Sequence, residues 1–231
     1  MGTRTYGQIL DGAWIKVNEQ TGGLAVRWPE AEGIRWLNNA ALEIVNQFPA
    51  ANTKAAVPTL VNDSRQTLAG LGLTDGLQFI DVVCAMATNG TTRGRPIRKA
   101  ERAWLDDNLP SWHTVTAEQP TTWCHDPRDP KAFYIYPRPT LFTKAEVLYA
   151  AVPTDQDALT DTWQLDDIHS NAAEAFVLYS FYSKDAAYTN NPQLAAGFWT
   201  LFLQMLGIRG QNLAGMAGVG DRKATGTVGA S

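Results

Sequence analysis

The hydrophobic pattern of this chain changes twice, and these changes constrain its fold more than any other feature. Up to Pro49, and again after about Asp166, apolar residues recur at intervals of three and four, as in helices with one buried face. Between residues 55 and 152, short β-type runs alternate with turn sequences such as Asp75-Gly76. We therefore expect an α+β, mainly helical protein: an antiparallel helix bundle with an inserted β-rich region and a flexible C-terminal arm.

This pattern predicts four segments. Residues 1–54 would form the N-terminal helices of the bundle, and residues 55–153 the inserted β-rich region with a short helix. Residues 154–206 would form a C-terminal helix hairpin that completes the bundle, with Gly207 as its C-cap. Residues 207–231 would form a Gly-rich extended tail, because seven glycines and no aromatic residue leave too little apolar area to offset the entropy of ordering. Such a tail is either flexible or an arm that orders on a partner.

The same periodicities predict the individual elements. The expected helices cover residues 5–17, 30–48, 98–108, 166–188 and 193–206. The expected strands cover residues 58–61, 66–68, 77–88, 121–125, 132–136 and 146–152. Asp126-Pro127 and Asp129-Pro130 predict a tight exposed turn between two of these strands, because proline does not continue a strand ladder.

The charge balance and cysteine content exclude several classes of protein. Lys plus Arg total 19 against 23 Asp plus Glu, and the net charge of −4 excludes a globally basic nucleic-acid-binding protein. Two cysteines, Cys84 and Cys124, are too few for a disulfide framework or a Cys-rich zinc module and fit a reducing compartment. No apolar run is long enough to cross a bilayer, and the N-terminus lacks the features of a secretion signal. We expect neither secretion nor a membrane partner.

No motif of the chain predicts catalysis, a metal or a cofactor. The glycine-rich run 215–223 has an aspartate where a phosphate loop needs its lysine. Cys124 and His125, beside Asp126, cannot easily share a metal ion because successive strand residues point to opposite faces. An enzyme is the alternative, for example a hydrolase with a site assembled from His125, Asp126 and His169. Such a site would require an apolar pocket with a perturbed titrating group.

One cluster of basic residues contrasts with the acidic chain. It contains five cations within ten residues, and only Glu101 opposes them. Three interpretations are open: a solvated loop and helix face, an ion-paired contact with an acidic neighbouring subunit, or a patch that faces nucleic acid. The residues predicted to lie at a subunit interface or in a lumen are Arg93, Arg95, Arg98, Lys99 and Arg102.

Aromatic residues form a second candidate site. The run Phe133-Tyr134-Ile135-Tyr136 places large rings on both faces of one expected strand. Core packing would account for one face, and an exposed apolar patch on the other would mark a protein interface. A core on both faces is the alternative. The predicted aromatic interface consists of Phe133, Tyr134 and Tyr136.

The linear order of several short segments gives a further indication. It includes a paired Asp-Pro turn before an aromatic strand that ends in proline, and a Ser-Lys-Asp-Ala sequence in a helix near the end. The segments lie at residues 34–45, 48–50, 97–100, 109–112, 123–130, 133–137, 147–153 and 179–186. This series, which spans about residues 5–206, resembles the head-to-tail adaptor (connector) proteins of tailed bacteriophages.

The resemblance implies a structural, non-enzymatic protein of the virion, located at the portal–tail junction and assembled in the host cytoplasm. It implies a closed homo-oligomeric ring, twelvefold in many connectors, between the portal protein and a tail or nozzle protein. DNA would pass through the lumen with only weak, non-specific binding. In many such rings the C-terminal segment embraces the portal, and here that segment would include Gly207, Ile208, Arg209, Leu213, Met216 and Val219. A tail-completion or tail-terminator protein is the alternative structural function.

Overall fold

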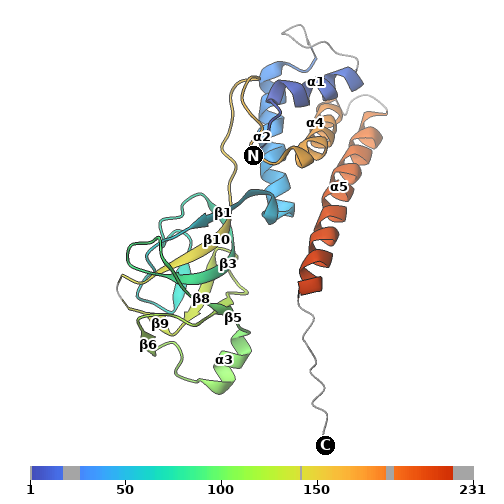
Figure 1. Cartoon of the computed structure of the whole chain (residues 1–231). Coiled ribbons are helices and arrows are strands. Elements are labelled where there is room, and N and C mark those ends of the chain that lie inside the picture. Colours follow the sequence, from blue (N-terminus) through green and yellow to red (C-terminus); the bar gives the residue numbers. More distant parts are fainter. Residues whose placement is uncertain (1, 18–26, 141, 186–189, 221–231) are drawn as a thin grey trace, which may run out of the picture. The chain divides into compact units, whose positions relative to one another are not determined.

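The chain forms two compact units, shown in the computed structural model of Figure 1. The structure describes residues 2–17, 27–140, 142–185 and 190–220, the last thirteen of these by their backbone alone. Residues 1–48 and 154–231 form one unit, here called the helical unit. Residues 49–153 form the other, here called the β unit. No helix among the described residues is long and apolar enough to span a membrane.

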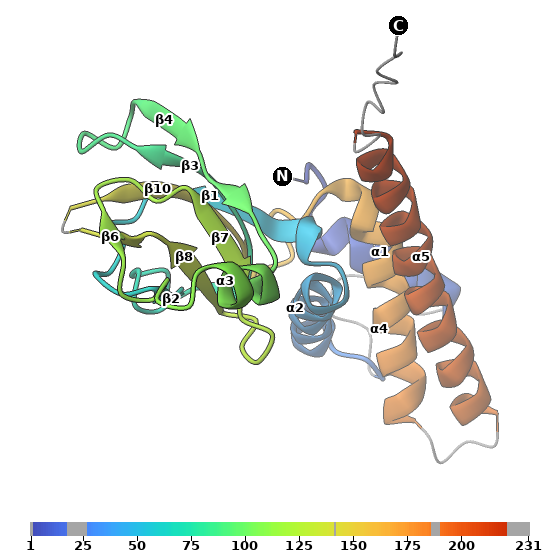
Figure 2. The same ribbon diagram turned by 90° about the horizontal axis from the view of Figure 1, so that it is seen from below.

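In its described residues, the helical unit contains four α-helices. They are α1 (Tyr6–Lys16), α2 (Glu30–Gln47), α4 (Ser170–Lys184) and α5 (Asn191–Gly220), with a 3-10 turn (Asp167–His169) before α4. Helices α1, α2 and α5 all pack against α4, and α5 lies alongside it (Figure 2). Helix α1 begins at a capping box, in which the side chains of Thr5 and Gln8 bind each other's backbone N–H.

The core of the helical unit consists of large side chains from several helices. Trp14 of α1, Leu37 of α2 and Phe181 of α4 are fully buried. A close approach of α2 to α1 requires glycine at position 33, because a Cβ there would lie 3.1 Å from the side chain of Leu10. The periodic apolar positions of the sequence therefore face one another, as the pattern predicted for α1, α2 and α4.

Helix α5 differs from its prediction. It continues past Gly207 to Gly220, so the prediction of a C-cap at Gly207 was wrong. The prediction of an extended conformation was also wrong for residues 207–220, which are helical. Glycine inside a helix costs about 1 kcal/mol relative to alanine and weakens the helix without terminating it. No proline interrupts residues 207–220, and the leucine, methionine and alanine residues between the glycines favour helix. Residues 221–231 of the expected tail lie outside the described residues.

The β unit holds three sheets. The first has the order β1-β10-β3-β4, formed by β1 (Thr53–Ala56), β10 (Lys144–Ala151), β3 (Gly76–Met86) and β4 (Arg93–Pro96). The second has the order β2-β8-β7-β5, formed by β2 (Arg65–Thr67), β8 (Ala132–Tyr136), β7 (Thr122–His125) and β5 (Arg98–Lys99). The third pairs β6 (Thr116–Ala117) with β9 (Arg138–Pro139). A 3-10 turn (Pro49–Asn52) precedes β1, and the short helix α3 (Arg102–Asn108) follows β5.

The two four-stranded sheets share one hydrophobic core. Phe79 of β3 stacks on Phe133 of β8 with ring centroids 4.1 Å apart, and it meets Trp123 of β7 edge to face at 5.1 Å. Val147 of β10 and Ile135 of β8 belong to the same buried cluster. The β unit is therefore held together by its own core, independently of the helices.

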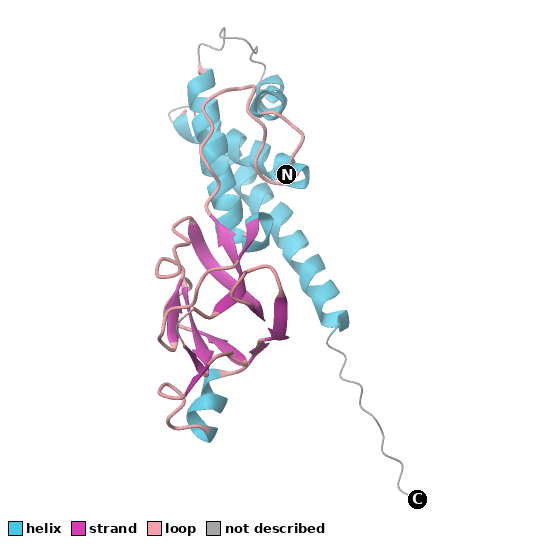
Figure 3. Ribbon diagram, turned by 60° about the vertical axis from the view of Figure 1, so that its left-hand side comes forward, coloured by secondary structure: helices cyan, strands magenta, loops and turns pink. Residues whose placement is uncertain are grey.

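The prediction of a mainly helical bundle was wrong. The protein is α+β, 39% helical and 25% strand, and the strands form a unit of their own (Figure 3). The pattern missed short strands with little or no apolar alternation, namely β1, β4, β5, β6 and β9. Residues 58–61, predicted as a strand, contribute only a bridge between Thr59 and Lys144. The helix predicted over 98–108 begins at Arg102, because Arg98 and Lys99 pair with β7 instead.

Candidate interaction surfaces

The basic cluster of the sequence lies along the outer edges of both four-stranded sheets. Strand β4 is the last strand of the first sheet and β5 the last strand of the second. The connecting residue Ile97 is buried in the shared core, so it anchors the segment while the charged residues on either side face outward. Charged edge strands resist pairing with strands of other molecules, which is one physical function of these cations.

Two of the five cations bind carboxylates of their own unit. The Nη2 of Arg93 lies 2.7 Å from Oε1 of the nearly buried Glu146, and this hydrogen bond raises the pKa of Arg93. Nε of Arg102 lies 3.5 Å from Oδ2 of Asp106, and its guanidinium lies 4.9 Å from the ring centroid of Tyr134. These two charges are therefore partly neutralised within the β unit.

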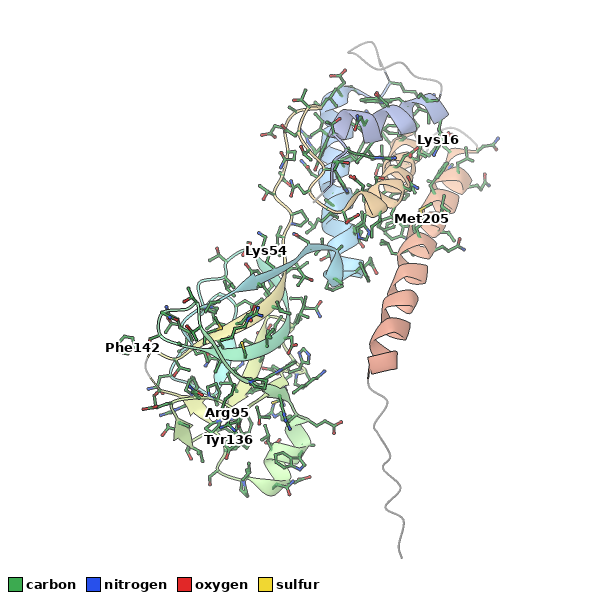
Figure 4. The ribbon with its side chains drawn as sticks, in the orientation of Figure 1. Lys16, Lys54, Arg95, Tyr136, Phe142 and Met205 are labelled. Atoms are coloured by element: carbon green, nitrogen blue, oxygen red, sulfur yellow. The ribbon has the colours of Figure 1, made fainter. Side chains whose placement is uncertain are left out.

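The other three cations, Arg95, Arg98 and Lys99, form the surface that we call the basic edge. All three are exposed, and within the described part of the chain no carboxylate pairs with them. Arg95, labelled in Figure 4, lines an open groove together with Arg98 and the residues Thr121 and Thr122. Nζ of Lys99 lies 5.6 Å from the ring centroid of Trp123. Two unpaired arginines that border one groove suit a carboxylate or a phosphate oxygen, because a guanidinium can bind either in a bidentate geometry.

The aromatic strand has both faces covered within the β unit. Phe133 is fully buried in the shared core, so its prediction as an interface residue was wrong. On the opposite face, Tyr134 and Tyr136 are half-buried and pack against Trp112 and residues of α3. Short helix α3 provides the cover that the alternation pattern could not indicate. For Tyr134 and Tyr136 the interface assignment stays a prediction.

A loop of the helical unit, residues 154–168, carries five aspartates and no lysine or arginine. We call it the acidic loop. Its backbone is fixed by hydrogen bonds from the Tyr6 N–H to the Asp161 carbonyl (2.9 Å) and from the Trp163 N–H to the Arg4 carbonyl (2.8 Å), and the side chain of Trp163 is fully buried. The sequence interpretation missed this surface, although the unbalanced run of aspartates was a visible signal.

The aspartates of the acidic loop differ in their partners. Asp161 accepts hydrogen bonds from the backbone of the loop itself, and Asp167 accepts them from Thr3. Asp166 caps the 3-10 turn. Asp155 and Asp157 are exposed, and their side chains have no ion-pair partner among the described residues.

Outside its buried side, helix α5 has an uncharged surface that includes exposed leucines and exposed polar residues such as Gln193 and Gln204. Its inner side buries Phe202 and Leu206, whereas Leu194, Leu201 and Leu203 are 44%, 39% and 38% exposed. Residues 191–207 include no charged residue. Of the predicted portal-binding residues, Gly207 is exposed on α5. The remaining predicted residues belong to the part of α5 that is described by its backbone alone: Ile208, Arg209, Leu213, Met216 and Val219.

The residues weighed for a hydrolase belong to two different units. The His125 ring packs on Phe79, with centroids 5.4 Å apart, and burial and the nearby Lys99 lower its pKa. The Asp126 carboxylate accepts hydrogen bonds from Arg65 and from the backbone of Arg128. His169 belongs to the helical unit, where it is buried. Neither unit therefore contains all three groups.

Two further observations bear on chemistry. Oγ of Ser64 lies 2.9 Å from Nδ1 of His113, but Ser64 is buried and no carboxylate orients the ring within the described residues. A nucleophile requires access to its substrate, so this pair is a structural hydrogen bond. The described part of the chain contains no group of three His, Cys, Asp or Glu residues that could hold a metal ion.

Comparison with known proteins adds family information to this geometry. The model of a family described as SU10 adaptor protein matches residues 4–226. No curated protein matches the chain. The match spans both units, and it confirms the resemblance of the sequence to phage head-to-tail adaptors.

Proposed function

This chain belongs to the SU10 adaptor protein family, and from that membership we propose that it forms a ring that joins the portal of a phage to its tail. As a phage adaptor it is a structural protein of the virion. The observation that carries the proposal is the family match over residues 4–226, which includes the helices and the sheets alike. In the proposed ring, about twelve copies surround a lumen through which DNA passes, a copy number that rests on the resemblance alone.

A closed ring requires each copy to offer different surfaces to its two neighbours, because its contacts are heterologous. The basic edge on the β unit, the acidic loop and the uncharged surface of α5 are three surfaces with different chemistry. A lumen through which DNA slides should bind it weakly. A net charge of −4 fits that requirement, since non-specific affinity for DNA depends on the number of phosphates that cations neutralise.

We assign the portal contact to residues 207–231, which include the C-terminal turns of α5. Phe202 and Leu206 are the last residues of α5 described as buried, and Gly207 is exposed. A chain that ends at Leu206 therefore keeps every buried contact described for this helix. If that chain fails to bind portal, the cause would be the missing contact surface and not a disrupted fold.

The test is the mass of the complex with portal protein. Light scattering would be measured on the full chain alone and after mixing with the portal protein of the same phage. We expect the chain to join portal in a fixed ring stoichiometry. A chain that ignores portal but binds a tail-tube protein would contradict this function and favour a tail-completion protein.

Two truncations locate the contact. The chain that ends at Leu206 should remain folded and fail to bind portal, and circular dichroism would check its helix content. The chain that ends at Gly220 keeps the whole of α5 and lacks only residues 221–231, so its portal binding shows which part of residues 207–231 makes the contact. Normal portal binding by the shorter chain would contradict the assignment of residues 207–231.

A further inference from the structure

We propose that the basic edge of one copy binds the acidic loop of the neighbouring copy, so that this pair of surfaces forms a contact between adjacent subunits. The inference rests on the proposed ring, and it deepens that function by naming the two surfaces that meet. It commits to a second copy of this chain as the partner of the basic edge.

The basic edge has the chemistry of a carboxylate-binding surface. Arg95 and Arg98 are exposed, and the structure gives neither a carboxylate partner among the described residues. Both line the open groove that also includes Thr121 and Thr122, so the two arginines border the same space. An arginine guanidinium can donate two parallel hydrogen bonds to one carboxylate, which gives such a contact both attraction and a defined geometry.

The acidic loop has the complementary chemistry. Asp155 and Asp157 are exposed and make no ion pair within the described part of the chain. Their backbone is already ordered: the Asn38 side chain binds both the N–H and the carbonyl of Gln156, which lies between the two aspartates. A surface with a fixed backbone loses little conformational entropy when it binds, which favours its use as a contact.

Charge balance favours a second copy over nucleic acid as the partner. The same chain carries both surfaces, so a heterologous contact between identical copies matches each basic edge with one acidic loop. A nucleic acid would be attracted by the basic edge and repelled by the acidic loop. Only three unpaired cations are available on that edge, which gives weak and strongly salt-dependent binding to phosphates.

Two charge-reversed chains test the contact. The first carries Arg95→Glu and Arg98→Glu, and the second carries Asp155→Lys and Asp157→Lys. None of the four side chains makes a described hydrogen bond or ion pair, so both variants should fold. Arg128→Glu with Lys131→Glu is the matched control, because it makes the same charge change at exposed residues elsewhere on the β unit.

The measurement is self-association by sedimentation velocity at low ionic strength, with the full-length chains. We expect wild type to associate, and each charge-reversed chain alone to associate at least about tenfold more weakly, because like charges then meet at every contact. An equimolar mixture of the two should associate almost as well as wild type, since each altered surface then meets its altered complement. The control should behave as wild type.

Each other result overturns the proposal. A wild type that stays monomeric, or two altered chains that remain monomeric when mixed, would show that these surfaces do not meet between copies. Loss of DNA binding by the first variant without any change in self-association would assign the basic edge to nucleic acid. Failure of this proposal can be distinguished from failure of the proposed function. Light scattering measures portal binding whether the chain is associated or monomeric, so that measurement does not depend on this contact.

Discussion

Replacing Phe133 with alanine should destabilise the β unit by about 3–5 kcal/mol. The ring is fully buried and stacks on Phe79 with centroids 4.1 Å apart, in the core that joins the two larger sheets. Removal of a buried phenylalanine loses the transfer free energy of the ring and leaves a cavity, which together cost about 3–5 kcal/mol. Phe133→Leu fills most of that volume and should cost about 1–2 kcal/mol, so it remains measurable if the alanine variant fails to fold.

Hydrogen exchange followed by mass spectrometry measures this change in the β unit alone. Amides of β3 and β8 should exchange about 100–4,000-fold faster in Phe133→Ala, because an opening free energy lowered by about 3–5 kcal/mol raises the open population by that factor. Tyr136→Ala is the control on the opposite face, where the ring is half-buried, and its effect should be about tenfold or less. Amides of α2 should not change, because they belong to the helical unit.

An effect of Tyr136→Ala that equals or exceeds that of Phe133→Ala would refute the reasoning. Side chains of a strand alternate between its faces, so a one-residue shift of β8 would turn Phe133 out of the shared core and Tyr136 into it. A larger effect of Tyr136→Ala would therefore mean that β8 does not pair with β7 in the register that places Cys124 opposite Tyr134.

Three further predictions concern single residues. Thr5→Ala removes one half of the capping box of α1 and should cost about 1 kcal/mol, read from faster amide exchange in the first turn of that helix. Burial would raise the pKa of Asp126, but the Arg128 amide and the Arg65 guanidinium lower it below its usual range. The stability from this ionised carboxylate is therefore complete above the usual carboxyl pKa of about 4 and is lost as the pH falls through the lower folded value. Accordingly, the urea midpoints of wild type and Asp126→Asn should differ at pH 6.5 and converge as the pH falls through the lowered folded pKa of Asp126, and a constant difference would contradict the assignment. Burial raises the pKa of Cys84 and of Cys124, the latter to about 11. Iodoacetamide at pH 8 should therefore label both buried thiols only after unfolding. Rapid labelling of the native chain would contradict their burial.

The strands that the sequence predicted are those that bury apolar side chains. Strand β8 was predicted with its observed bounds, because alternating aromatic residues lie between a double Asp-Pro turn and a proline. Strands β1 and β4 were missed, because Thr53–Ala56 and Arg93–Pro96 contain little that distinguishes them from a loop. What makes them strands is pairing: β1 pairs with β10, which lies far away in the sequence, and β4 pairs with β3, which precedes it by a short turn. Such edge strands are defined by their neighbours and not by their own composition.

Helix α5 shows a different limit. Glycine at position 207 was a reasonable C-cap, since helices often end where glycine adopts a positive φ. In the structure, positive φ among the described glycines occurs only at Gly72 and Gly90, both in turns of the β unit. A glycine therefore predicts a helix end only when the residues that follow cannot continue the helix, and residues 208–220 contain no proline to stop it.

The basic cluster illustrates why a charged surface cannot be predicted by counting residues. Five cations lie within ten residues of the sequence, but Glu146, which is distant in the chain, binds Arg93, and Asp106 lies one helical turn from Arg102. The folded β unit therefore leaves Arg95, Arg98 and Lys99 without carboxylates among its described residues, although Arg93 lies on the same edge strand as Arg95. If an acidic neighbour is the partner, Arg95 and Arg98 should control association, whereas Arg93→Ala should chiefly expose Glu146 and destabilise the pairing of β3 with β10. Separating the effects of these substitutions on association and on stability would distinguish the charges that hold the unit together from those that are free to bind a partner.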